Sequence, residues 1–233
     1  MIFQHSQEIW RDFPELVPGV IAADGIASDT TVDEQVETYS RLASGRLAHA
    51  TESELPEIRA WRQTFSRMGL KPTQYRCASE SLLRRFRKEG SLPRIHPLID
   101  LCNAISLAYA IPIAVFDRSR IRGSLEVRRA TGDERYETFA GDMEHPEHGE
   151  VIFADDDGRA HARRWTNRQS GASAIRDSTR TILIVAEAMH PTAAEDVQRL
   201  IADLATELRT LWPTTPATAL LAREAPRFDF PAA

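Results

Sequence analysis

The chain has 233 residues, of which 42% are hydrophobic and 27% charged, with a formal net charge of −5 and a pI near 5.8. These values are typical of a globular protein with a sizeable core, and the acidic balance argues against broad, non-specific binding to nucleic acid. The two cysteines, Cys77 and Cys102, are isolated, which argues against a disulfide scaffold. The N-terminus lacks the basic segment followed by an apolar segment that marks a signal peptide, and no apolar run is long enough to span a membrane. We therefore expect a cytoplasmic protein.

The first half of the chain is predicted to be mostly helical. Residues 7–23 contain strand formers interrupted by proline and glycine, which indicates an edge strand. Apolar residues then recur at helical spacing in four segments. These helices are expected over residues 33–48, 54–68, 78–88 and 96–110. Pro97 opens the last of them, which is apolar almost all round and therefore typical of a buried central helix.

The second half changes to strand patterns and closes with a helix. Strands are expected over residues 111–117, 124–130, 136–139, 151–154, 160–165 and 181–186, with a hairpin turn at 155–158. Residues 193–212 form an amphipathic helix, and residues 213–233 hold four prolines and little periodicity, which predicts a tail. This order predicts an α+β layering rather than alternating βαβ units, and no glycine-rich phosphate loop is present.

Two polar residues share one face of the apolar helix at 96–110. Asp100 and Asn103 are three positions apart. A buried polar group without a partner costs about 1–3 kcal/mol, so both must bond to the backbone, to each other or to a ligand. The residues alone leave open whether the pair is structural or lines a pocket.

Several segments between residues 79 and 188 occur in the order of a known family. Asp100-Leu101-Cys102-Asn103 and the strand at 111–117 resemble a Val-Asp-x-Thr-Asn helix followed by a Gln-Pro-Met-His-Ala-Phe-Asp strand. Residues 120–128 are similar to the next strand of that family, and residues 170–171 and 179–187 resemble its closing strand. The family is the B-three/B-four domain, the tRNA editing domain of the phenylalanyl-tRNA synthetase β subunit. Residues 163–168 resemble a signature of its free-standing relatives.

The resemblance implies a fold and an activity. The fold would be an α+β, three-layer domain over residues 1–212, with a β-sandwich of unusual topology flanked by helices, and a tail at 213–233. In the family, this domain hydrolyses the ester of tRNA-Phe mischarged with tyrosine. The implied partner is therefore the acceptor end of a tRNA or another aminoacyl ester, with no cofactor and no metal. Aminoacylation by this chain alone is not expected.

The family's site residues carry over position by position. Asn103 matches the helix asparagine and is assigned to position the substrate. Asp100, Cys102 and Ala114 take substrate-binding places, with Cys102 standing where the family has threonine and Ala114 where it has histidine. These two departures put recognition of tyrosine in question.

The closing segments supply the remaining site candidates. Ser170 and Gly171 are expected to line the pocket, and the pocket glutamate of the family falls at Arg168. Glu187, at the end of the closing strand, is a second catalytic candidate because a carboxylate there can hold a water or an amino group. Its alternative is a surface glutamate at a strand end.

Arginines gather in two segments that either contact RNA or form solvated faces paired with the abundant acids. Arg84 and Arg85 belong to the first, and Arg163, Arg164 and Arg168 belong to the second. Arginine suits bidentate phosphate contacts. Trp165 lies between these guanidinium groups and is either a base-stacking residue or a core residue shielded by arginine stems.

Other candidates are weaker. Cys102 is a possible nucleophile without a neighbouring histidine in the sequence, and His145 and His148 lie in an acidic loop with metal-ligand residue types. Three hypotheses remain. They are a trans-acting hydrolase of misacylated tRNA, a non-catalytic module that binds an amino-acid-like molecule or an RNA end, and a purely structural role.

Overall fold

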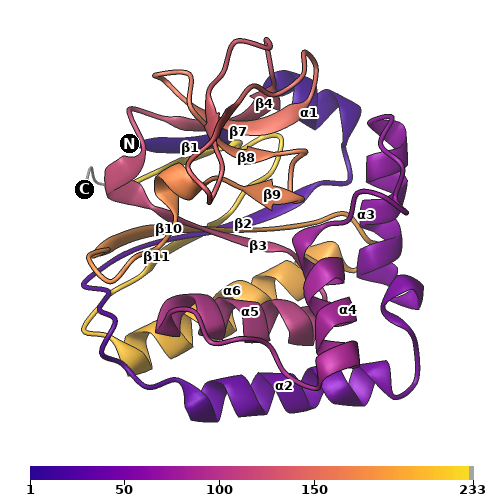
Figure 1. Ribbon diagram of the computed structural model, residues 1–233, viewed down its shortest axis with the longest axis vertical. Coiled ribbons are helices and arrows are strands. Elements are labelled where there is room, and N and C mark those ends of the chain that lie inside the picture. The colour runs from indigo at the N-terminus through magenta and orange to yellow at the C-terminus, as the bar shows by residue number, and fades with distance from the viewer. Residues whose placement is uncertain (231–233) are drawn as a thin grey trace.

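The computed structural model describes residues 1–230, and within them two β-sheets and one helical layer lie on top of one another (Figure 1). The first sheet has six strands in the order β12 (Arg227–Asp229), β1 (Ile2–His5), β4 (Leu125–Arg129), β7 (Val151–Asp155), β8 (Ala160–Arg163) and β9 (Arg168–Gln169). The second has four strands in the order β11 (Ala217–Leu220), β2 (Val17–Asp24), β10 (Thr181–Ala188) and β3 (Ile113–Asp117).

Helices form the third layer and close one end of the sandwich. The α-helices are α1 (Gln7–Asp12), α2 (Asp33–Leu47), α3 (Pro56–Arg67), α4 (Ala78–Glu89), α5 (Pro97–Tyr109) and α6 (Ala193–Leu211). Three 3₁₀ turns, η1 (Glu52–Glu54), η2 (Arg118–Arg120) and η3 (Gly171–Ser173), and a small hairpin of β5 (Tyr136–Glu137) and β6 (Met143–Glu144) complete the described fold. The α+β, three-layer prediction is confirmed.

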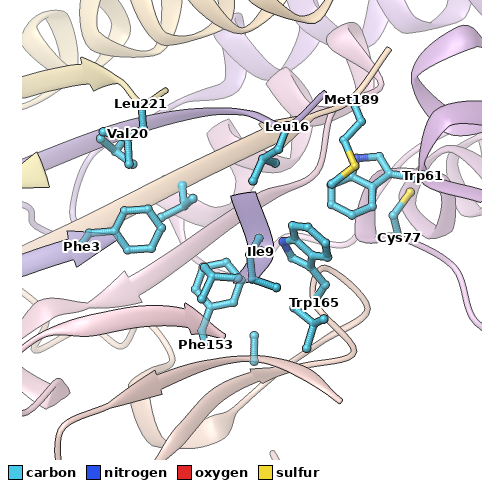
Figure 2. Packing of buried hydrophobic residues seen from close by; sticks show 14 of the residues in the cluster. Phe3, Ile9, Leu16, Val20, Trp61, Cys77, Phe153, Trp165, Met189 and Leu221 are labelled. Atoms are coloured by element: carbon cyan, nitrogen blue, oxygen red, sulfur yellow. The ribbon is translucent and has the colours of Figure 1, made fainter. Parts of the chain in front are cut away.

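Strand β10 explains why the layers stack as they do. It pairs antiparallel with β2 on one side and with β3 on the other. Leu183 and Val185 point into the core between the two sheets, where Phe3 and Phe153 also lie (Figure 2). Ile182, Ile184 and Ala186 face α5 and α6 instead. A strand covered on both faces needs a continuous apolar run, which is the pattern of this segment.

A glycine lets α6 approach β2 closely. A Cβ atom at Gly19 would lie 2.5 Å from Ile201 and 2.6 Å from Val197, both on α6. Real side-chain carbons do not reach these separations, so only glycine fits here. The contact fixes the helical layer against the second sheet.

Two predictions from the sequence are wrong. Residues 7–12 are the helix α1 rather than strand, because Ser6 accepts a hydrogen bond from the Ile9 amide as an N-cap and Trp10 is buried. The segment after residue 212 is not a tail in its described part, since β11 pairs with β2 and β12 with β1. Residues 231–233 lie outside the described residues. The other predicted helices begin and end within two residues of the observed ones.

Candidate functional site

A small hollow of about 60 Å³ opens between the free edges of the two sheets. Its walls are β3, the end of β10, the first residue of α4 and the connection from β8 to β9. Strand β3 is the edge of the second sheet and β9 the edge of the first. Gln169 bridges them by donating from Nε2 to the Val115 carbonyl oxygen at 2.5 Å. Ala114, which the sequence assigns to substrate binding, lies on this wall.

The polar centre of the hollow is the carboxylate of Glu187, which is 2% exposed. Glu187 follows the alternation of Leu183 and Val185, so its side chain points between the sheets. Its Oε1 lies 2.7 Å from Nε2 of His5 and accepts from Nε1 of Trp165 at 2.9 Å. A buried carboxylate is tolerated only when donors surround it, and these two rings supply them. The surface alternative for Glu187 is wrong.

The backbone before β9 adopts an unusual conformation. Arg164 and Trp165 have φ values of +47° and +59°, the left-handed region that non-glycine residues rarely occupy. The Arg164 amide donates to Glu150 Oε1 at 3.0 Å, and the Trp165 amide to the Val151 carbonyl at 2.7 Å. Such outliers cost of order 1–3 kcal/mol each and cluster at functional sites. Here they turn the Trp165 indole toward Glu187 and leave the next four residues on the wall of the hollow.

The predicted pair on the central helix lies elsewhere. Asp100 and Asn103 line a second hollow of about 200 Å³, between α2, α5 and the connection from α4 to α5. Asp100 Oδ1 accepts from the Ile95 amide at 2.9 Å, so the backbone satisfies it. Asn103 is only partly buried. The structure therefore does not bring Asn103 to the same hollow as Ala114 and Glu187.

Cys102 is sealed in the core between α5 and the second sheet. Burial raises the pKa of its thiol far above the usual range. Burial likewise raises the pKa of Cys77, just before α4, to about 11. Because a cysteine nucleophile attacks as the thiolate, neither thiol is suited to that role.

Ser170 and Gly171 lie directly after the wall of the hollow and hold the β5–β6 hairpin in place. The Ser170 hydroxyl donates to the Glu137 carbonyl at 2.7 Å. A Cβ atom at Gly171 would lie 2.7 Å from the Thr138 carbonyl oxygen, so the two segments touch through their backbones. Neither residue lines the hollow, although the sequence analysis expected both on its wall.

The arginines predicted to contact RNA divide into two groups. Arg163 is buried, and its guanidinium donates to Glu144 at 2.6 Å and to Glu150 at 2.9 Å, so its charge is neutralised. Trp165 is 0% exposed. Their predicted roles on phosphate and base are wrong, because the indole is part of the core and the guanidinium belongs to a buried ion pair.

The remaining arginines reach the surface. Arg168 is exposed at the hollow and pairs with Glu144, while Arg164 lies over the ring of Tyr75 at 4.8 Å. On α4, Arg84 pairs with Glu52 at 3.1 Å and Arg85 with Glu89 at 2.8 Å. Exposed ion pairs are weak, so Arg85 and Arg168 can exchange their partners for a phosphate, whereas Arg84 is held by the buried carboxylate of Glu52.

A Ser–His–Asp arrangement that the sequence reading missed lies beside the site. Ser173 Oγ is 2.8 Å from His161 Nδ1, and His161 Nε2 is 3.1 Å from Asp155 Oδ2. All three residues are at least 95% buried, and Asp155 also accepts from backbone amides of the β7–β8 turn. Burial by itself would raise the pKa of Asp155, but bonds from His161 and the turn hold it below its usual value. The arrangement anchors a hairpin and offers no substrate access.

One group of side chains in the described part has the residue types and spacing for a metal. Ligand atoms of Glu57, His190 and Asp196 lie within 4.8 Å of one another. Glu57, however, binds the Arg46 guanidinium with both oxygens at 2.7 and 2.8 Å, and Asp196 bonds His190 at 2.8 Å. Burial would raise the pKa of Asp196, yet bonds from Thr192, His190 and Arg199 lower it to about 2. These contacts form an ion-pair network that joins α2, α3 and α6.

The fold and the hollow together define the class of protein. It is a three-layer α+β domain whose site opens between the edges of two sheets around a buried carboxylate, without a usable thiol. The model of one family, the B3/4 domain, matches residues 60–211, a wider stretch than the 79–188 expected from the sequence. The chain therefore belongs to the B3/4 domain family.

The chain is also similar to parts of two longer proteins. The phenylalanine–tRNA ligase β subunit of Streptomyces avermitilis is 34% identical over 77 residues, which cover 33% of this chain and 9% of that protein. A crystal structure of an N-terminal fragment of the phenylalanyl-tRNA synthetase β subunit from Pyrococcus horikoshii superposes with a TM-score of 0.48 and 8% identity. That comparison covers 92% of this chain and 49% of the fragment. Within the described residues, no helix combines the length and apolarity needed to cross a membrane.

Proposed function

We propose that this chain hydrolyses an aminoacyl ester at the acceptor end of a misacylated tRNA, with the aminoacyl group held in the hollow between β3 and β9. Membership of the B3/4 family and similarity to a phenylalanine–tRNA ligase β subunit support this substrate class. The observation that carries the proposal is the buried Glu187, oriented by His5 and Trp165 at the wall of the hollow.

The geometry of Glu187 suits a hydrolytic role. Both ring donors bond to Oε1, and among the described residues Oε2 has no hydrogen-bond partner. Oε2 is then available to the α-ammonium group of the substrate or to the attacking water. Such a site accelerates the reaction by positioning, since water adds to the ester carbonyl and the ribose oxygen leaves with a proton. No covalent enzyme intermediate is required.

The size and lining of the hollow favour a small aminoacyl group. Its volume of about 60 Å³ is far below the roughly 300–1,000 Å³ of sites for whole drug-sized ligands. Ile113, Phe153 and Val185 make the walls largely apolar, and Ala114 replaces the histidine that the family carries. We therefore expect small or branched aliphatic aminoacyl groups to be better substrates than tyrosine.

Arginines at the rim provide contacts for the nucleic acid. Arg168 lies on the wall of the hollow, and Arg164 lies on the same connection between β8 and β9. The side-chain amide of Asn167 donates to the backbone carbonyl of Arg76 at 2.8 Å, so Arg76 lies next to this connection. An acidic protein with a locally basic rim binds an RNA end through few contacts and without broad affinity. Asn103 does not line this hollow, and it remains a candidate site residue of the second hollow.

A deacylation assay tests the proposal. Purified chain is incubated with a panel of mischarged tRNAs, and Glu187→Gln is compared with the surface control Glu89→Gln. Loss of at least about 100-fold in Glu187→Gln, with the control unchanged, is expected for a residue that positions the reacting groups. Asn103→Ala discriminates between the two hollows. A folded chain inactive on the whole panel, at high concentration, excludes the hydrolase.

A second candidate function rests on a different observation. Cys102 and Ala114 stand where the family carries threonine and histidine, so the polar side chains that would contact a tyrosine substrate are missing. A module that binds an amino-acid-like molecule or an RNA end without hydrolysis fits this loss. Free amino acids and non-hydrolysable aminoacyl-adenosine analogues should then raise the melting temperature while every tRNA ester stays intact.

A further inference from the structure

A larger hollow of about 760 Å³ lies on the other side of His5, away from the candidate site. Its walls are the end of β1, the start of α1, Glu126 of β4 and the segment that leads into β12. Its volume falls within the range of ligand sites for small molecules and cofactors. Most of these walls lie outside residues 60–211, which the B3/4 family model matches.

Arginines outnumber acids on the walls of this hollow, with Arg11, Arg223 and Arg227 against Glu8 and Glu126. Glu8 pairs with Arg129 at 3.1 Å, while Glu126 accepts from the neutral Gln4 at 2.9 Å and keeps its charge. Arg223 forms no ion pair or hydrogen bond among the described residues, and Arg227 has an acid only at 3.8 Å. Arginine forks without a carboxylate partner are suited to a phosphate.

The backbone holds these two arginines at the hollow. Arg223 lies in a tight turn closed by two hydrogen bonds between Ala222 and Ala225, at 3.2 and 3.0 Å. Arg227 begins β12 and lies opposite Gln4 in the pairing with β1, one position before His5. Both arginines therefore come from ordered strand and turn structure.

Two buried rings on the wall of this hollow carry unsatisfied nitrogens. His5 and Trp10 are 3% and 4% exposed and pack edge to face with centroids 5.3 Å apart. Neither Nδ1 of His5 nor Nε1 of Trp10 has a hydrogen-bond partner among the described residues. Unpaired buried groups are unusual in native proteins and call for a partner. Both nitrogens are closed to solvent in this structure, so a ligand hydroxyl or a water reaches them only when the side chains around them move.

We propose that this hollow binds a phosphate-bearing molecule of nucleotide size, with Arg223 and Arg227 on the phosphate and a hydroxyl or water bridging His5 and Trp10. The same His5 contacts Glu187 of the candidate site through its other ring nitrogen, at 2.7 Å. Occupancy of the large hollow is thereby transmitted to Glu187 and Trp165. This inference does not depend on the hydrolase activity.

Calorimetric titration of the full chain with 5′-AMP, inorganic phosphate and a 5′-phosphorylated trinucleotide tests the site. We expect 5′-AMP to bind, and Arg223→Ala combined with Arg227→Ala to weaken binding by about tenfold or more. Arg41→Ala, on the exposed face of α2, is the matched control and should bind as the wild type does. Comparable binding of 5′-AMP and the trinucleotide indicates a free nucleotide, whereas tighter binding of the trinucleotide indicates an RNA end.

Two results would overturn the proposal: no binding of any probe up to about 10 mM, or binding that the double variant leaves unchanged. The link to the candidate site is read separately, from the indole N–H signal of Trp165 in an NMR titration with 5′-AMP. This signal is expected to shift, because its acceptor Glu187 also bonds His5. An unshifted signal at saturation would refute the transmission while leaving the binding result intact.

Discussion

Removing the Glu187 carboxylate is expected to destabilise the fold strongly, because two buried donors depend on it. In Glu187→Ala, Nε2 of His5 and Nε1 of Trp165 lose their acceptor, and both rings are buried. An unpaired buried donor costs about 1–3 kcal/mol, and Glu187→Ala leaves two of them. We therefore expect the free energy of unfolding to fall by about 3–5 kcal/mol.

The matched variant Glu187→Gln keeps an acceptor oxygen of the same reach. It should cost about 1 kcal/mol, since only the charge-assisted part of the two bonds is lost. Urea unfolding at pH 7, followed by tryptophan fluorescence and far-UV circular dichroism, gives both values. A double-mutant cycle with His5→Phe should show a coupling energy above about 1 kcal/mol.

A loss of less than about 1 kcal/mol in Glu187→Ala would contradict this expectation. That result would mean that the two rings find other partners or that water reaches them. It would also remove the structural basis for placing Glu187 at the centre of the site. A large loss in Glu187→Ala with a small one in Glu187→Gln would support the assignment.

Three further predictions concern other parts of the fold. Gly19→Val should lower the free energy of unfolding by about 2 kcal/mol or more in urea, because the valine side chain would overlap α6. Gly45→Ala, at an open position of helix α2, should raise it by about 0.5–1 kcal/mol. Burial would raise the pKa of Glu134, but hydrogen bonds from backbone amides and an arginine lower it to about 2. Its contribution to stability is therefore present above pH ~4.5 and lost as the pH falls toward 2. Glu134→Gln should flatten the acid limb of a stability–pH curve, and an unchanged limb would contradict this. Cys77 and Cys102 should react with a thiol reagent only at the rate of unfolding, and rapid labelling of the native chain would show that the core is open.

Much of the fold could be predicted because its elements have strong local patterns. The apolar helix at Pro97–Tyr109 and the strand at Thr181–Ala188 are recognisable from residue spacing and composition alone. The helix at 7–12 was missed because it is only six residues long and depends on the Ser6 cap. The strands after residue 212 were missed because they have no periodicity of their own and form only against the edges of β2 and β1.

The residues of the candidate site could likewise be predicted only in part. The sequence by itself determined the family, the layered α+β class and Ala114 and Glu187 as site candidates, because motif order and strand ends are local properties of the chain. Only the tertiary structure decided that Asn103 lines a different hollow, that Trp165 is a core donor to Glu187, and that His5 completes the buried group. Burial and hydrogen-bond partners are set by segments up to 182 residues apart, and no spacing within one segment encodes them.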